Sequence, residues 1–189
     1  SQTAPTIITG QTAETSIATD DLILLSDTSA SGALKKITQA NFVSGVGGAN
    51  TPAFRAKSAS GQTIANTTHT QIVFGTETID TDSAFASNTF TVPSGKAGKY
   101  FIYAQTGEQN WNANRGLIII RKLVGGSYNS DIGVGELTTG QAYYPTVSAS
   151  TIVDLSVGDG VDVTFYQDSG SSRDLSTGDR TMFMGFKLL

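Results

Sequence analysis

The clearest structural signal in the chain lies in residues 146–167, TVSASTIVDLSVGDGVDVTFYQ. Small or apolar side chains occupy every second position in both halves of this segment: Val147, Ala149, Thr151, Val153 and Leu155, and then Val161, Val163 and Phe165. Successive side chains of a β-strand point to opposite faces, so this period of two predicts two strands that each bury one face. Asp159-Gly160 between them predicts a tight turn, because Gly tolerates the positive φ that such turns require.

Further short strand candidates, separated by turn residues, fill the rest of the chain beyond residue 52. Such regular spacing is typical of a sandwich or barrel rather than of alternating strands and helices. Residues 117–120 are apolar on both faces, which predicts a strand at the centre of a sandwich or against another subunit. The candidate strands are residues 53–56, 70–74, 78–79, 89–92, 98–105, 115–123, 127–133, 146–155, 160–167 and 181–189.

The composition agrees with a β-rich protein and excludes several classes of function. The chain has 189 residues, 21 of them Gly, and only 15% are charged, which favours short strands and tight turns. It has no Cys, so disulfides, thiolate metal sites and thiol nucleophiles are excluded. The net charge is −4 with dispersed Lys and Arg, so we expect no nucleic-acid partner. No run approaches the roughly 20 apolar residues that span a bilayer, so we expect no membrane insertion.

A second, smaller unit is predicted before residue 50. Residues 20–27 and 33–37 read as a β-hairpin, and residues 38–43 as a short helix with Thr38 as its N-cap. A Gly-rich stretch ended by Pro52 follows, and it has the composition of a linker. We therefore expect two parts: an N-terminal arm and docking element at residues 1–50, and one domain at residues 51–189.

The larger part resembles the globular heads of the C1q/TNF family. The resemblance runs in the family's order from its opening strand to a closing strand that ends the chain. The segments that carry it are residues 52–56 (PAFRA), 71–74 (QIVF), 90–93 (FTVP), 98–104 (GKYFIYA), 153–163 (VDLSVGDGVDV) and 182–189 (MFMGFKLL).

This resemblance implies an all-β, jelly-roll β-sandwich that assembles as a homotrimer. We expect the trimer interface to include Phe54, Ile119 and Phe186. No cofactor or metal ion is expected from the residues, although the resemblance leaves room for a calcium ion near the three-fold axis. The Gly residues before Pro52 lack the Gly-X-Y period of a collagen stalk, which argues against an animal secreted protein.

The N-terminal element resembles a short element of phage fibre and other virion structural proteins. The segments concerned are residues 20–30 (DDLILLSDTSA) and 32–42 (GALKKITQANF). Together the two resemblances imply a non-enzymatic bacteriophage virion protein at the particle surface. We expect a trimeric fibre, tip or spike that contacts the host surface, with residues 1–50 docked on other virion proteins. The alternative is a capsid decoration protein, which the short length of 189 residues favours.

Candidate ligand residues lie in predicted loops. Trp111 stands among Asn110, Asn112 and Arg115, and an aromatic ring beside amides suits a glycan, whose apolar face stacks on the ring. An interface or loop-packing Trp is the alternative. Tyr143 and Tyr144 are secondary candidates for the same recognition surface, whose ligand would be a host glycan or protein.

The chain shows no catalytic constellation. His69 is the only histidine and stands without a partner pattern, so we expect a structural role at a loop-to-strand edge. Carboxylates recur in pairs at 80 and 82, 159 and 162, and 174 and 179. None has calcium-loop spacing, so we expect them to form turns.

Overall fold

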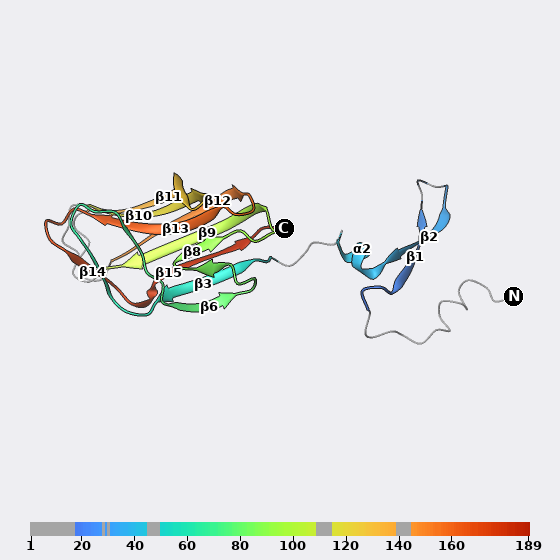
Figure 1. Cartoon of the computed structure of the whole chain (residues 1–189), viewed down its shortest axis with the longest axis horizontal. Helices are drawn as coiled ribbons and strands as arrows, with labels where there is room; N and C mark the ends of the chain where they lie inside the picture. Colours follow the sequence, from blue (N-terminus) through green and yellow to red (C-terminus); the bar gives the residue numbers. More distant parts are fainter. Residues whose placement is uncertain (1–17, 28, 30, 45–49, 109–114, 139–144) are drawn as a thin grey trace. The chain divides into compact units, whose positions relative to one another are not determined.

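The structure is a computed structural model that describes residues 18–27, 29, 31–44, 50–108, 115–138 and 145–189 (Figure 1). The described residues form two compact units, which divide between residues 49 and 50. We call the larger unit, Asn50–Leu189, the head. No helix in the described part of the chain combines the length and apolar character that crossing a bilayer requires.

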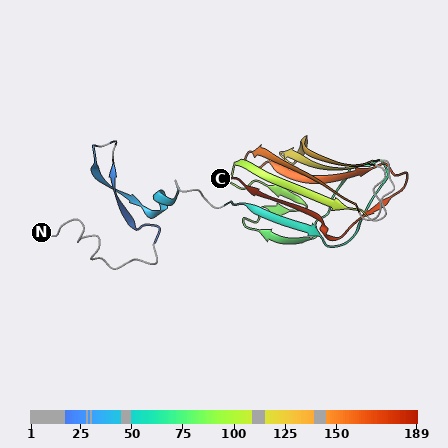
Figure 2. The same ribbon diagram turned by 180° about the vertical axis from the view of Figure 1, so that it is seen from behind.

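The head is a sandwich of two antiparallel sheets, and both views show its long strands running along its length (Figures 1 and 2). Sheet I has five strands in the order β12-β9-β15-β3-β6. Sheet II has six, in the order β11-β10-β13-β8-β7 with β5 paired to β13. The strands of sheet I are β12 (Thr146–Leu155), β9 (Gly98–Gly107), β15 (Gly178–Lys187), β3 (Ala53–Ser58) and β6 (Thr76–Asp80). Those of sheet II are β11 (Ser127–Thr138), β10 (Arg115–Val124), β13 (Gly160–Gln167), β8 (Thr89–Thr91), β7 (Phe85–Ala86) and β5 (Thr70–Gln71).

The sequence predicts ten of the strands of the head. Among the described residues it misses only β4 (Gln62–Ile64), β7 and β14 (Arg173–Leu175), of which β4 and β14 pair as a small two-stranded sheet. These strands have two or three residues, which is too short for a period of two to show. The expectation of an all-β sandwich is confirmed.

The core consists of the inward faces that the alternation predicts. In β12, Val147, Ala149 and Leu155 are buried, and in β13 Val161 and Phe165 are fully buried. An aromatic cluster closes one part of the core, with the Phe54 ring stacked 4.6 Å from Phe90 and edge-on to Phe183 at 4.8 Å, measured between centroids. Offset and edge-on aromatic pairs add to the stabilisation from burial.

The turn predicted at residues 159–160 exists, but its role differs from the expectation. Asp159 donates its backbone N–H to the Ser156 carbonyl at 3.0 Å, and Gly158, not Gly160, has the positive φ of 84°. The strands on either side pair with different partners, since β12 lies in sheet I and β13 in sheet II. The turn therefore crosses from one sheet to the other and does not close a hairpin.

Gly135 allows the two sheets to approach each other along one side. A Cβ atom at this position would lie 2.1 Å from the carbonyl oxygen of Ser148 in β12. Such a contact is far inside van der Waals distance, so only Gly fits where β11 of sheet II passes the edge of sheet I.

The smaller unit contains the predicted hairpin and helix. β1 (Leu22–Asp27) pairs antiparallel with β2 (Ala33–Thr38), and α2 (Gln39–Ser44) follows directly. Thr38 Oγ1 accepts a hydrogen bond from the backbone N–H of Asn41 at 3.3 Å, which confirms Thr38 as the N-cap.

Candidate functional site

The described residues next to the predicted ligand residues lie at one end of the head. Trp111, Asn110, Asn112, Tyr143 and Tyr144 lie outside the described residues, so their roles stay predictions. Their anchors are described: the Glu108 N–H donates to the Pro145 carbonyl at 3.1 Å, and Arg115 pairs with Thr138 across β10 and β11. The described residues that flank these two segments therefore lie next to each other in pairs.

This end is opposite the one where the chain enters the head. The Lys187 N–H donates to the Pro52 carbonyl at 3.0 Å, and the Leu188 N–H donates to Lys99, near the start of β9. Glu108 follows the other end of the same ten-residue strand. Pro52 and Glu108 therefore lie at opposite ends of the head.

Arg115 is the one predicted ligand residue that the structure describes. Its Nε donates to Glu136 Oε1 at 2.9 Å, and its backbone N–H donates to Asp168 Oδ1 at 2.7 Å. Both side chains of the ion pair are about half exposed. The Arg115 guanidinium therefore already has a partner in sheet II. A ligand that bound Arg115 would have to share the guanidinium with Glu136.

Glu108 is a buried acid that the sequence does not single out. Its side chain is fully buried, and within the described part of the chain neither carboxylate oxygen has a hydrogen-bond partner. Burial raises the pKa of Glu108 from 4.5 to about 7, and the charges of Arg173 and Asp174 act on it in opposite directions. A neutral carboxyl group costs less to enclose than a carboxylate, so folding favours its protonated form.

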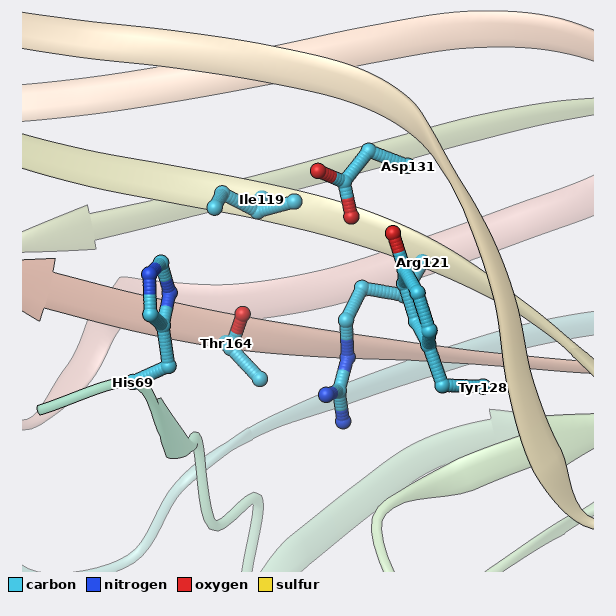
Figure 3. A pocket seen from close by; sticks show the side chains of 6 residues that line it. All are labelled: His69, Ile119, Arg121, Tyr128, Asp131 and Thr164. Carbon is cyan, nitrogen blue, oxygen red and sulfur yellow. The ribbon is translucent and has the colours of Figure 1, made fainter.

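The outer face of sheet II carries a pocket of about 290 Å³ (Figure 3). Ile119 and Thr164, which are directly paired in β10 and β13, line it. The other lining residues are His69, Arg121, Tyr128 and Asp131. His69 is exposed just before β5, as expected, and its ring packs 4.8 Å from that of Tyr166. The pocket therefore joins an apolar surface to hydrogen-bonding groups.

An ion pair fixes one wall of this pocket. Arg121 Nε donates to Asp162 Oδ1 at 2.9 Å, and Arg121 Nη2 donates to Asp162 Oδ2 at 2.5 Å. Gln71 adds a third hydrogen bond to this carboxylate at 3.0 Å. The Asp162 side chain is only 3% exposed, so the pair is enclosed and the positive charge of Arg121 is used within the protein.

The outer face of sheet I has a different character. Six large, mostly apolar side chains lie on it, including both methionines of the chain, and we call this set the apolar face: Phe101, Tyr103, Ile152, Met182, Met184 and Phe186. Ile152, Phe101 and Phe186 form one row across β12, β9 and β15. The rings of Phe101 and Phe186 lie 5.6 Å apart, and Ile152 is 64% exposed.

The three residues expected at a trimer interface lie in three different places. Phe186 belongs to the apolar face of sheet I, whereas Ile119 lies on the outer face of sheet II and is only 6% exposed. Phe54 is 2% exposed inside its own aromatic cluster, so it has no surface to offer a partner. The interface role expected for Phe54 is corrected, because β3 turns this side chain toward the core.

Several carboxylates form turns, as the sequence predicts. Asp80 accepts hydrogen bonds from the backbone N–H groups of Ala84 and Phe85, and Asp159 accepts one from Ser156. Asp162 differs, because it pairs with Arg121 inside sheet II. In the parts of the chain that the structure describes, no three His, Asp or Glu residues gather as a metal site would require.

The comparisons with known proteins agree with the fold of the head. No protein-family model matches the sequence, and no curated protein matches it. Solved structures do match. The globular domain of zebrafish complement 1qA has a TM-score of 0.54 and 16% identity, with 73% of this chain and 98% of that chain covered. Murine APRIL at pH 5.0 has a TM-score of 0.56 and 14% identity, with 72% and 98% covered. Eiger TNF from S. frugiperda has a TM-score of 0.52 and 11% identity, with 72% and 92% covered. The chain thus has the jelly-roll fold of the C1q and TNF heads that its sequence predicts.

Proposed function

We propose that the chain is a subunit of a homotrimeric bacteriophage virion structural protein. In this proposal the apolar face of sheet I joins the subunits, the N-terminal unit docks on other virion proteins, and the head contacts the host surface. The protein acts by binding and not by catalysis. The apolar face is the observation that carries the proposal.

A contiguous apolar patch on a sheet is typical of a protein interface. Its centre holds aromatic and Met side chains, which are enriched where proteins meet. Charged pairs flank it, namely Arg55 with Asp179 at 2.7 Å and Lys99 with Asp154 at 3.0 Å. An apolar centre with a charged rim is the usual anatomy of a subunit contact. The likeness to C1q and TNF heads favours three subunits over two.

The N-terminal unit supports a docking role. Leu22, Leu24 and Leu34 lie on one face of the hairpin, at 59%, 68% and 70% exposure. A two-stranded hairpin is marginally stable in water by itself, so burial of these leucines against another protein would stabilise it. The resemblance of this unit to elements of phage virion proteins favours other virion proteins as its partners.

Capsid decoration remains the second candidate, because exposed leucines would dock on coat subunits as readily as on a tail. The two candidates differ in what the head touches. Avidity matters for host contact, since three weak sites on one trimer raise the effective concentration of the second and third contacts. A decoration protein needs no affinity for cells.

The test is to locate the protein. Ser94 is exposed in a turn of the head, and the chain has no Cys, so Ser94→Cys can carry a single dye. The labelled trimer would be added at matched concentration to particles that lack the protein and to host cells. We expect the labelled protein to bind both particles and cells. The double variant Leu24→Asp/Leu34→Asp should no longer bind particles but should still bind cells.

Two other results would change the proposal. Binding to capsids alone would replace host contact by decoration. Binding to neither would contradict a virion role. The control is Val157→Asp, which charges an exposed apolar residue of the head and should leave both signals unchanged.

A further inference from the structure

The pocket on sheet II is shaped by two irregularities in β11. The register of β11 against β10 shifts between Ile120 and Arg121 and again between Lys122 and Leu123. The first shift brings Asp131 opposite Arg121, and Ile132, the residue that it skips, packs against the core. The second brings Tyr128 opposite Leu123. β-Bulges redirect side chains in this way and are frequent beside binding sites.

The buried hydroxyl of Thr164 points to a ligand. Thr164 is 2% exposed and lines the pocket, and its Oγ1 has no hydrogen-bond partner within the described residues. Figure 3 shows this oxygen directed toward Ile119, between His69 on one side and Arg121 on the other. A buried polar atom without a partner is unfavourable, and a ligand hydroxyl in the pocket would provide the missing hydrogen bond.

The charges around the pocket disfavour an anion as the natural ligand. The guanidinium of Arg121 is held by Asp162 on one side, and its Cζ lies 5.9 Å from the centre of the Tyr128 ring. Asp131 is exposed, and no hydrogen bond or ion pair of its carboxylate occurs in the part of the chain that the structure describes. A phosphate or carboxylate would meet this unneutralised negative charge.

The remaining groups suit a neutral molecule with many hydroxyls. The Asp131 carboxylate accepts hydrogen bonds, the Thr164 hydroxyl donates or accepts, and the His69 ring can do either. The exposed ring of Tyr128 offers apolar surface to C–H groups. A purely apolar ligand would leave the Asp131 and Thr164 oxygens without partners. A volume of about 290 Å³ lies at the small end of ligand sites, which suits one sugar ring.

We infer that this pocket binds one neutral hexose residue. The sugar's hydroxyls bond to Thr164 and Asp131, and its ring lies on the exposed ring of Tyr128. The site belongs to the folded head alone, so the inference holds wherever the protein sits and whatever its role on a particle. The pocket is small and partly open to solvent, so we expect the affinity of one site to be on the order of millimolar.

The test is a titration of the full chain followed by methyl NMR. The methyl groups of Ile119 and Thr164 report on the pocket, and Ile79, exposed on sheet I, is the internal control. The probes are glucose, galactose, mannose and N-acetylglucosamine, with methylguanidinium and inorganic phosphate as charged counterparts. We expect at least one sugar to shift both pocket methyls in a saturable way and to leave Ile79 unmoved.

Two variants separate binding from folding. Thr164→Val keeps the shape of the side chain and removes the hydroxyl, and Asp131→Asn keeps a surface hydrogen-bonding group without the charge. Each is expected to weaken sugar binding about tenfold, the effect of losing one good hydrogen bond. Glu77→Gln, at an exposed carboxylate of β6 in sheet I, should change nothing.

Three results would overturn the inference. The first is that no sugar moves Ile119 at concentrations up to about 50 mM, well above the expected dissociation constant. The second is that methylguanidinium or phosphate shifts the pocket and the sugars do not. The third is that sugar binding is unchanged in both folded variants.

Discussion

The outer faces of the two sheets differ although their inner faces are alike. Both sheets turn Ile, Val, Leu and Phe toward one shared core. Outside, sheet I carries the apolar face, whereas sheet II carries the Arg121–Asp162 pair and a pocket with polar walls. Burial of the inner faces determines that a sandwich forms, and the outer faces determine which molecules the sandwich binds. The apolar face suits another protein, and the polar one suits water or a small ligand.

The difference between the two outer faces requires first that the two sheets pack closely, and Gly135 allows β11 to approach β12. Gly135→Ala places a Cβ where the Ser148 carbonyl oxygen stands, so β11 must move away from β12. We expect the free energy of unfolding to fall by about 3 kcal/mol, at the upper end of the range for overpacking. Urea unfolding followed by circular dichroism measures it.

Gly61→Ala is the matched control, because its nearest neighbour would lie at 3.7 Å, an ordinary contact. It should change the unfolding free energy by less than about 1 kcal/mol. Equal losses in the two variants would mean that the close approach of β11 and β12 has no special part in the fold.

The second prediction concerns ion pairs on the polar face. Arg121→Met leaves the buried Asp162 carboxylate with the hydrogen bond from Gln71 alone. Removing one partner of an enclosed pair is costly, and the partial exposure of Arg121 reduces the cost to about 2 to 3 kcal/mol.

Arg115→Met breaks the half-exposed pair with Glu136 in the same sheet. Exposed pairs contribute about 1 kcal/mol or less, so this variant should unfold close to the wild-type urea concentration. If the two variants lose the same stability, burial of Asp162 is not what distinguishes the pair at the pocket.

The third prediction sharpens the difference between an enclosed acid and an exposed one. The pKa of Glu108 is 4.5 unfolded and about 7 folded, so between these values the folded chain binds more protons. The unfolding free energy should therefore fall as the pH rises from about 4.5 to 7 and level off above. Glu108→Gln should remove this dependence and stabilise the protein by about 2 kcal/mol at pH 8.

Urea midpoints at pH 5 and pH 8 measure this effect. The exposed Glu77→Gln serves as the control and should keep the wild-type dependence. If Glu108→Gln also keeps the wild-type pH dependence, burial does not raise the pKa of Glu108, and other groups compensate for its burial.

The inner faces of the sandwich could be predicted from the sequence. The alternation in β12 and β13 identifies their buried residues, and in β10 Ile118 and Ile120 reach the core. The same rule applied to β3, where Phe54 and Ala56 alternate with Arg55, would have assigned Phe54 to the core. The resemblance to a trimeric family suggested an interface instead, and local alternation was the better guide.

The polar sites could not be predicted, because they depend on contacts distant in the sequence. Asp162 and Thr164 alternate with buried residues in β13, which reads as a solvent-facing side. Asp162 is enclosed because Arg121 and Gln71 reach it from other strands, and Thr164 lies between its paired neighbours Ile119 and Gln71. The bulges that bring Asp131 to the pocket leave no pattern in the sequence, and nothing around Glu108 marks it as buried.

The most direct measurement of the central claim is the molar mass of two variants by light scattering. Phe186→Asp charges the apolar face of sheet I, and Val134→Asp charges a residue of sheet II that is 56% exposed. The wild type and Val134→Asp should have three times the 19.7 kDa chain mass, and a folded Phe186→Asp should have one. A trimer that survives Phe186→Asp, or a wild-type protein with the mass of one chain, would contradict the account.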